Sequence, residues 1–163
     1  MLLGILLWMF GTSAQAQEIW GFQDPVAEPP RIYAELENAP VRPGEASSLK
    51  VHITPAPGWY LYSVVSAGEW GPLPTEVKVP TPWLEASGPL SESEPKVMFD
   101  EAYGTTLRVH DVPFVLRLPL RVLPEAPPGL QEGWGILTFQ ACNQKICLPA
   151  STQEFPIPLE IAP

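Results

Sequence analysis

Proline is the residue that most limits how this chain can fold. The 163 residues include 22 prolines, which are spread along the chain from Pro25 to Pro163. A proline inside a helix costs about 3 kcal/mol, whereas turns and the edges of sheets tolerate it. No window of useful length shows the amphipathic spacing of a helix. The sequence therefore predicts an all-β protein made of short strands.

The segments between the prolines alternate between apolar and polar residues, as half-buried strands do. In residues 48–54, Leu49, Val51 and Ile53 face one way while the residues between them face the other. Residues 113–123 repeat the pattern, and residues 134–141 are rich in β-forming residues but alternate less cleanly. In residues 154–161, Phe155, Ile157, Leu159 and Ile161 share one face opposite two prolines, as in an edge strand. With turn signals such as Ala-Pro-Gly, these runs predict an antiparallel β-sandwich with one core.

The N-terminal residues differ in composition from the rest of the sequence. Residues 2–10 are apolar and are followed by Ser-Ala-Gln-Ala, which resembles the end of a secretory signal peptide. We therefore expect a signal peptide over residues 1–16, a flexible lead-in over 17–30 and one domain over 31–163. A buried N-terminal helix is the alternative for the first segment. The expected product is an exported, periplasmic or extracytoplasmic protein with no membrane span after cleavage, and residues 85–95 are expected to form a solvated loop.

The formal net charge is −9. Nucleic-acid binding requires a basic surface that meets the phosphates, so the acidic balance argues against a nucleic-acid partner. It indicates a solvated acidic surface and little else.

The only two cysteines are Cys142 and Cys147, in Phe-Gln-Ala-Cys-Asn-Gln-Lys-Ile-Cys-Leu-Pro. The segment is predicted to be a hairpin, which would bring the cysteines to the separation of about 5.5–6 Å between Cα atoms that is common in disulfides. In an exported protein the pair would form a structural disulfide or an exchanging one. As a staple it would contribute only about 2 kcal/mol, because the closed loop is short.

A copper or zinc site is the third interpretation of the cysteines. Two thiolates need further ligands, and the candidates are His52, His110 and Met98. None of the three lies at a metal-ligand spacing from the cysteines, and a surface position is the commoner explanation for each histidine. We therefore predict no metal.

Three segments together resemble the N-terminal periplasmic domain of the disulfide-reductase family DsbD. They are Ala-Pro-Gly-Trp-Tyr-Leu-Tyr-Ser at 56–63, Phe-Asp-Glu-Ala-Tyr-Gly at 99–104, and the cysteine hairpin at 139–149. The resemblance implies an immunoglobulin-like β-sandwich that passes electrons by thiol–disulfide exchange. It also implies that Cys147 is the sulfur that forms a mixed disulfide with a partner and that Cys142 resolves it, with no organic cofactor.

The resemblance assigns four further residues to the surroundings of the sulfurs. Asp100 and Glu101 match acidic residues that would raise the pKa of a neighbouring thiol or relay a proton, although they could also be solvated loop carboxylates. Tyr60 and Tyr62 match tyrosines that border the pair. Together with Trp59, these tyrosines could equally be core aromatics.

This chain departs from the family at the lid of the disulfide. The best-known members carry a Phe after the Asp-Glu pair, and here Ala102 takes that place. Phe99 or Tyr103 could replace the missing ring, or the pair could be less shielded.

Full-length members continue into a membrane domain and a thioredoxin-like domain, whereas this sequence stops at Pro163. The resemblance therefore implies thioredoxin-like partners and a separate membrane electron carrier. A binding module that is not an enzyme, with a structural disulfide, remains the alternative function.

Overall fold

A computed structural model describes residues 28–163, and the expected signal peptide and most of the expected lead-in lie outside this range. Those residues form twelve β-strands and no helix, so none of them belongs to a helix that could cross a membrane. The predicted all-β, immunoglobulin-like sandwich is confirmed. The strands are β1 (Arg31–Leu36), β2 (Ala46–Thr54), β3 (Tyr60–Tyr62), β4 (Glu76–Lys78), β5 (Leu84–Ala86), β6 (Ser91–Glu92), β7 (Lys96–Asp100), β8 (Thr105–His110), β9 (Phe114–Val122), β10 (Gly129–Phe139), β11 (Ala141–Cys142) and β12 (Ser151–Ile161).

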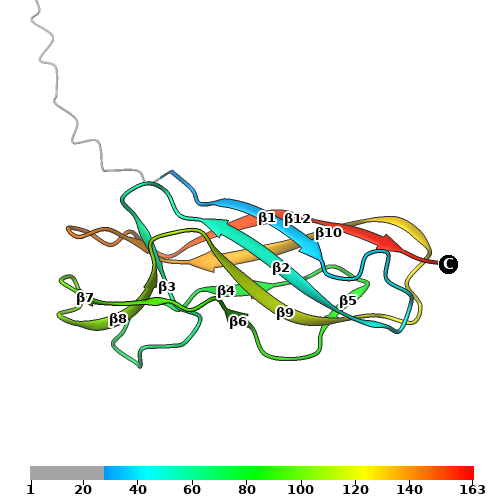
Figure 1. The fold of residues 1–163 in the computed structure, drawn as a ribbon, viewed down its shortest axis with the longest axis horizontal. Helices are drawn as coiled ribbons and strands as arrows, with labels where there is room; N and C mark the ends of the chain where they lie inside the picture. The colour runs from blue at the N-terminus through cyan, green and yellow to red at the C-terminus, as the bar shows by residue number, and fades with distance from the viewer. Residues whose placement is uncertain (1–27) are drawn as a thin grey trace, which may run out of the picture.

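Two antiparallel sheets enclose the main core. One has the order β1-β2-β9-β5, with β6 also paired to β9, and the other has the order β12-β10-β4. Figure 1 shows the long strands of both sheets running along the length of the molecule. The inner faces carry mainly aliphatic side chains, so burial of apolar surface holds the two sheets together.

The alternating runs in the sequence form the long strands of the sandwich. In β2, Leu49, Val51 and Ile53 are buried, and in β9 every second residue from Phe114 to Val122 is buried. In β12 the four apolar residues point inward, and the strand lies at the edge of its sheet as its prolines predict.

Pro119 lies inside β9, a strand with neighbours on both sides. The strand next to it is interrupted at this point, because β5 pairs with residues 120–122 and β6 with residues 116–117. The missing N–H of Pro119 therefore interrupts no ladder, and its carbonyl oxygen still accepts a hydrogen bond from Ser87 N–H at 2.9 Å.

A third sheet, β11-β3-β8-β7, extends one end of the sandwich. All three residues of β3 are buried, because the strand separates two clusters of side chains. Leu61 packs in the main core, while Tyr60 and Tyr62 point to the opposite face into a second, smaller cluster. The strand β11 divides in the same way, with Ala141 in the main core and Cys142 in the second cluster. This shared wall places the cysteine beside the two tyrosines.

The prediction of a solvated loop over residues 85–95 was wrong in one part: the segment is largely exposed, but it includes β6 and most of β5. The Glu92 side chain is 8% exposed and its carboxylate lies 2.8 Å from Nε2 of His110, whose side chain is 2% exposed. His110 also stacks on Phe114, with ring centroids 3.8 Å apart. The expectation of a surface histidine at this position was therefore also wrong, whereas His52 is partly exposed and contacts Glu35.

Candidate functional site

Cys142 and Cys147 face each other across a tight hairpin and form a disulfide. The hairpin is closed by two backbone hydrogen bonds, Asn143 N–H to Ile146 O and Leu148 N–H to Ala141 O, both 2.9 Å. These bonds flank the cysteines, so the cysteines form a non-hydrogen-bonded pair, in which strands approach most closely. Their Cα atoms are accordingly 4.1 Å apart, which is closer than the sequence-based expectation.

The turn of the hairpin is stabilised by one side chain. Oδ1 of Asn143 accepts hydrogen bonds from the backbone N–H groups of Lys145 at 2.8 Å and Ile146 at 2.9 Å. Asn and Asp commonly stabilise turns in this way. The turn fixes the separation of the two sulfur-bearing residues.

The two sulfurs differ in accessibility. Cys142 has no exposed surface, whereas Cys147 is half-buried at the rim of the second cluster. A sulfur that is attacked in line by another protein's thiolate must be reachable from outside. Of the two cysteines, only Cys147 has exposed surface.

The Tyr62 hydroxyl links the disulfide to a buried carboxylate. It lies 3.0 Å from Sγ of Cys142, 3.5 Å from Sγ of Cys147 and 2.7 Å from Oδ2 of Asp100. The Tyr60 hydroxyl lies 2.8 Å from the same carboxylate oxygen, and the two tyrosine rings meet edge to face. The structure therefore brings Tyr60, Tyr62 and Asp100 together around the sulfurs.

Asp100 is only 1% exposed, and hydrogen bonds offset the cost of its burial. Oδ2 accepts the two tyrosine hydroxyls, while Oδ1 accepts the backbone N–H groups of Ala102 at 2.9 Å and Tyr103 at 3.2 Å. Four donors thus satisfy one carboxylate. The carboxylate in turn fixes the turn between β7 and β8.

Both tyrosines are held in the neutral form. Burial, and next the hydrogen bond to the Asp100 carboxylate, raise the pKa of Tyr60 to about 12. The same two causes, in the same order, raise the pKa of Tyr62 above its usual value. Each hydroxyl therefore keeps its hydrogen at neutral pH and can act as a hydrogen-bond donor.

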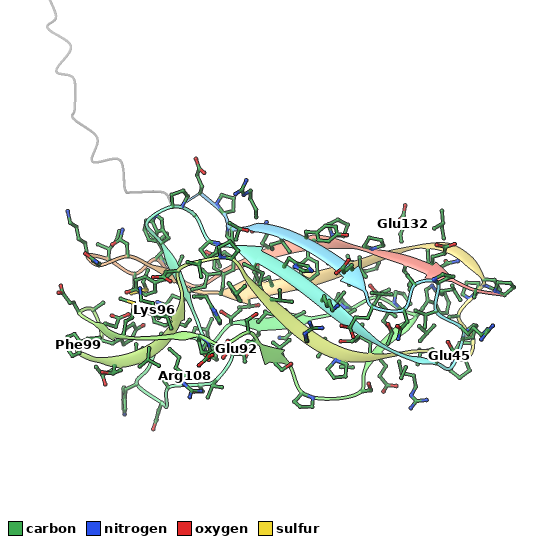
Figure 2. The ribbon with its side chains drawn as sticks, viewed as in Figure 1. Glu45, Glu92, Lys96, Phe99, Arg108 and Glu132 are labelled. Atoms are coloured by element: carbon green, nitrogen blue, oxygen red, sulfur yellow. A yellow bond between two sulfur atoms is a disulfide. The ribbon has the colours of Figure 1, made fainter. Side chains whose placement is uncertain are left out.

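Of the three candidates for a lid, only Tyr103 packs against the second cluster. Its ring meets that of Tyr62 edge to face, with centroids 5.9 Å apart. Phe99 is 61% exposed and Ala102 is also exposed. Figure 2 shows Phe99 at the end of the molecule opposite to Glu45.

Gln140 is a residue of this site to which sequence reasoning gave no role. Its Oε1 accepts hydrogen bonds from the Tyr103 hydroxyl at 3.3 Å and from Leu73 N–H at 3.1 Å, and its Nε2 donates to Leu148 O at 3.2 Å. It therefore joins the β7–β8 turn, the β3–β4 loop and the residue after Cys147. The signal in the sequence that could have identified Gln140 was its position two residues before Cys142.

The other candidate residues make no hydrogen bond to the sulfurs in the described part of the chain, and Met98 packs against the second cluster. Glu101 is exposed, and its side chain makes none of the hydrogen bonds that surround the disulfide in the described part of the chain. Trp59 packs against the main core. Within residues 28–163, no group of three or more His, Cys, Asp or Glu side chains is arranged to hold a metal ion.

Comparisons with known proteins agree with the fold and with the pair of cysteines. Residues 31–159 match the family described as "Thiol:disulfide interchange protein DsbD, N-terminal". None of the curated proteins matches the chain.

Solved structures also resemble the chain, among them two N-terminal domains. The N-terminal periplasmic domain of ScsB from Proteus mirabilis is 18% identical with a TM-score of 0.52; the match covers 81% of this chain and 47% of that one. The reduced N-terminal domain of Neisseria meningitidis DsbD is 22% identical with a TM-score of 0.48, and the match covers 79% and 85% of the two chains. The family match and the Cys142–Cys147 disulfide together support thiol–disulfide exchange as the general activity. The chain belongs to the family of DsbD N-terminal domains.

Proposed function

We propose that this protein exchanges disulfides with thioredoxin-like proteins through Cys142 and Cys147. The observation that carries the proposal is the asymmetry of the pair: Cys142 is fully buried with its sulfur beside a tyrosine hydroxyl, and Cys147 is half-buried at the rim. No organic cofactor or metal takes part in the proposed reaction.

The exchange proceeds in two steps when the protein accepts electrons. A thiolate of the partner attacks Sγ of Cys147; the new bond joins these two sulfurs, the Cys142–Cys147 bond breaks, and its electron pair remains on Cys142. The partner's second thiolate then attacks the partner's own sulfur in the mixed disulfide. The partner leaves oxidised and both cysteines of this chain are reduced.

The reverse direction uses the same sulfurs. The Cys147 thiolate attacks a partner disulfide, and the Cys142 thiolate then attacks Cys147 and releases the partner as a dithiol. Cys147 is thus the attacking residue and Cys142 the resolving residue.

Tyr62 and Asp100 act on the buried sulfur in this scheme. The Tyr62 hydroxyl can donate a hydrogen bond to the Cys142 thiolate when the disulfide opens, while Asp100 keeps its three other donors. The Asp100 carboxylate, joined to the sulfur through the Tyr62 hydroxyl, would repel the negative charge of the same thiolate. Tyr103, held by Gln140, is the proposed lid in place of the Phe that other members carry.

The setting of the reaction is part of the proposal. Export to the periplasm would give the oxidising surroundings in which an exchanging disulfide is useful, and a separate membrane electron carrier would regenerate the reduced pair. A downstream role in cytochrome c biogenesis is one use of such a carrier.

The reduction potential of the pair tests the proposal. The protein is equilibrated in glutathione buffers, and its thiols are counted after labelling with a mass tag. We expect a potential above about −300 mV and exchange with thioredoxin, whereas structural disulfides lie below that value. A disulfide that resists millimolar glutathione and exchanges with no thioredoxin-like protein would make the pair a staple and refute the proposal.

A further inference from the structure

Large apolar side chains are exposed at the end of the molecule that holds the disulfide. Nine such side chains are exposed in the described part of the chain, and three of them lie in the loop of residues 63–75, which joins β3 to β4. Trp70 in this loop is the most exposed of the nine, at 89%. Tryptophan is enriched among the residues that dominate binding near the centres of protein interfaces.

The base of this loop is firmly anchored. Thr75 N–H donates to Ser63 O at 3.1 Å, and the Thr75 hydroxyl donates to Tyr62 O, so the two ends of the loop are closed together. The buried carboxylate of Glu92 accepts the Ser63 hydroxyl and, at 3.0 Å, Val64 N–H. A loop with ends held in this way is a compact Ω-type loop, a kind that frequently carries function.

The tip of the loop is also constrained. Gly71 N–H donates to Gly68 O at 3.2 Å, and Gly68 has a positive φ of 100° that favours glycine. A Cβ on Gly71 would lie 2.8 Å from the Cβ of Ala67, so the turn requires glycine there. Trp70 is therefore exposed on a turn whose backbone is already constrained. The backbone of the turn would lose little conformational entropy when a partner covers Trp70.

Hydrogen bonds through Gln140 connect the loop to the hairpin that carries the two cysteines. Leu73 N–H bonds to Gln140, and Gln140 bonds to the carbonyl of Leu148, the residue that follows Cys147. Trp70 is three residues from Leu73, so their Cα atoms are at most about 11 Å apart. A protein interface of ordinary size covers about 800 Å² on each partner and is roughly 30 Å across. An interface of that size, centred on Cys147, can therefore extend to Trp70.

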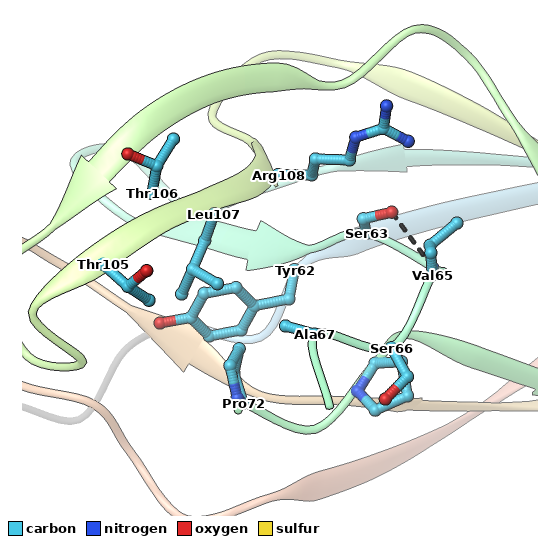
Figure 3. A pocket seen from close by; sticks show the side chains of 11 residues that line it. Tyr62, Ser63, Val65, Ser66, Ala67, Pro72, Thr105, Thr106, Leu107 and Arg108 are labelled. Atoms are coloured by element: carbon cyan, nitrogen blue, oxygen red, sulfur yellow. Dashed lines mark hydrogen bonds between the residues drawn. The ribbon is translucent and has the colours of Figure 1, made fainter. Parts of the chain in front are cut away.

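A pocket of about 350 Å³ lies between the loop and β8. Figure 3 shows Tyr62 and Leu107 lining it together with Ala67 and Pro72 of the loop. Tyr62 is the residue whose hydroxyl contacts both sulfurs. The pocket beside the loop and the redox site thus share Tyr62 as a common wall.

From these observations we propose that loop 63–75 is the docking element for the redox partner and that Trp70 is its anchor. The occupant is a thioredoxin-like protein that presents apolar surface around its reactive cysteine. This inference rests on the proposed function and adds to it the surface that selects the partner. Trp70 touches neither sulfur; it positions the partner's cysteine over Cys147.

The test compares a protein reductant with a small one. The rate of reduction of the oxidised protein is measured with reduced thioredoxin and, separately, with dithiothreitol, which needs no docking surface. We expect Trp70→Ala to react with thioredoxin about tenfold or more slowly, because truncation of an interface anchor commonly costs that much. Its rate of reduction by dithiothreitol should stay within about twofold of the parent protein, and its reduction potential should be unchanged within error. Trp70→Phe should recover most of the lost rate with thioredoxin.

The control is Leu130→Ala, which truncates a side chain that is 83% exposed near the start of β10. That position lies about nine residues, or roughly 30 Å, along the strand from the end that leads to the cysteines. Leu130→Ala should be reduced by thioredoxin and by dithiothreitol as fast as the parent protein.

Equal loss with thioredoxin and dithiothreitol would place the effect of Trp70 on the disulfide itself and would overturn the inference. So would an unchanged rate for Trp70→Ala with thioredoxin, or an equal loss in Leu130→Ala. If the parent protein is reduced by dithiothreitol but not by thioredoxin, the proposed partner class fails, and this inference fails with it for that separate reason.

Discussion

The replacement Tyr62→Phe tests whether the tyrosine hydroxyl stabilises the buried Cys142 thiolate. The substitution removes one oxygen that lies 3.0 Å from Sγ of Cys142 and leaves the ring in place. A hydrogen bond to a charged group contributes about 1.5–3 kcal/mol, and one pKa unit corresponds to about 1.4 kcal/mol. The pKa of the Cys142 thiol should therefore rise by about one to two units.

The rate of reduction should fall by less than the full equilibrium effect. About half of the charge has developed on the leaving sulfur in the transition state, so a rise of one to two units slows the attack on Cys147 by about three- to tenfold. The melting temperature should also fall by several degrees, because Asp100 loses one of its four donors at a site that is 1% exposed.

The assay is a titration of the single thiol in a Cys147→Ser background, followed by the ultraviolet absorbance of the thiolate. Tyr60→Phe is the matched control, because its hydroxyl lies 2.8 Å from the same Asp100 oxygen and does not contact sulfur. The control should shift the thiol pKa far less. An unchanged or lowered thiol pKa in Tyr62→Phe would show that the hydroxyl does not serve the thiolate, and equal shifts in both variants would assign the effect to Asp100 alone.

Three further predictions follow from the buried groups. Folding raises the pKa of Tyr60 from 10.0 to about 12, so the stability that neutral Tyr60 contributes is fully present below about pH 10 and is lost as the pH rises through about 12. Tyr60→Phe should therefore show a smaller drop in melting temperature at alkaline pH. Glu92→Gln should lower stability by about 1–3 kcal/mol and speed hydrogen exchange at the Val64 amide, because the carboxylate accepts that N–H. Tyr103→Phe removes the hydrogen bond to Gln140 and should speed reduction by dithiothreitol by about two- to fivefold without a change in reduction potential, whereas an unchanged rate would show that this hydrogen bond does not hold the lid in place.

The long strands could be predicted because each of them has one buried face. Period-two patterning survives in β2, β9 and β12, where apolar residues point into one core and polar residues point to solvent. The prolines of β12 also indicated its place at a sheet edge.

The short strands and the buried polar pair could not be predicted. The segment around β6 is polar and has no apolar alternation, so nothing in its sequence indicated pairing with β9. Burial of Glu92 depends on three donors, from Ser63, Val64 and His110, that come from distant parts of the chain. A charge is buried where the fold assembles its partners, and the spacing of residues in one segment does not report that assembly.

The composition of the redox site follows from the position of β3 between two cores. A strand buried on both faces must fill each face with apolar or hydrogen-bonded side chains, and its alternation sends Leu61 to the sandwich and both tyrosines to the small cluster. Tyrosines buried there need acceptors, and Asp100 supplies one oxygen to both. A carboxylate buried there needs donors, and the tyrosines with the β7–β8 turn supply four. Each polar group is thus stable in the cluster because the others satisfy its hydrogen bonds. The pairing of β11 with β3 places Cys142 beside Tyr60. There its sulfur contacts the Tyr62 hydroxyl, which can donate to either the carboxylate or the sulfur. The same contacts that make the cluster stable therefore place a movable hydrogen bond at the sulfur that must carry charge when the disulfide opens.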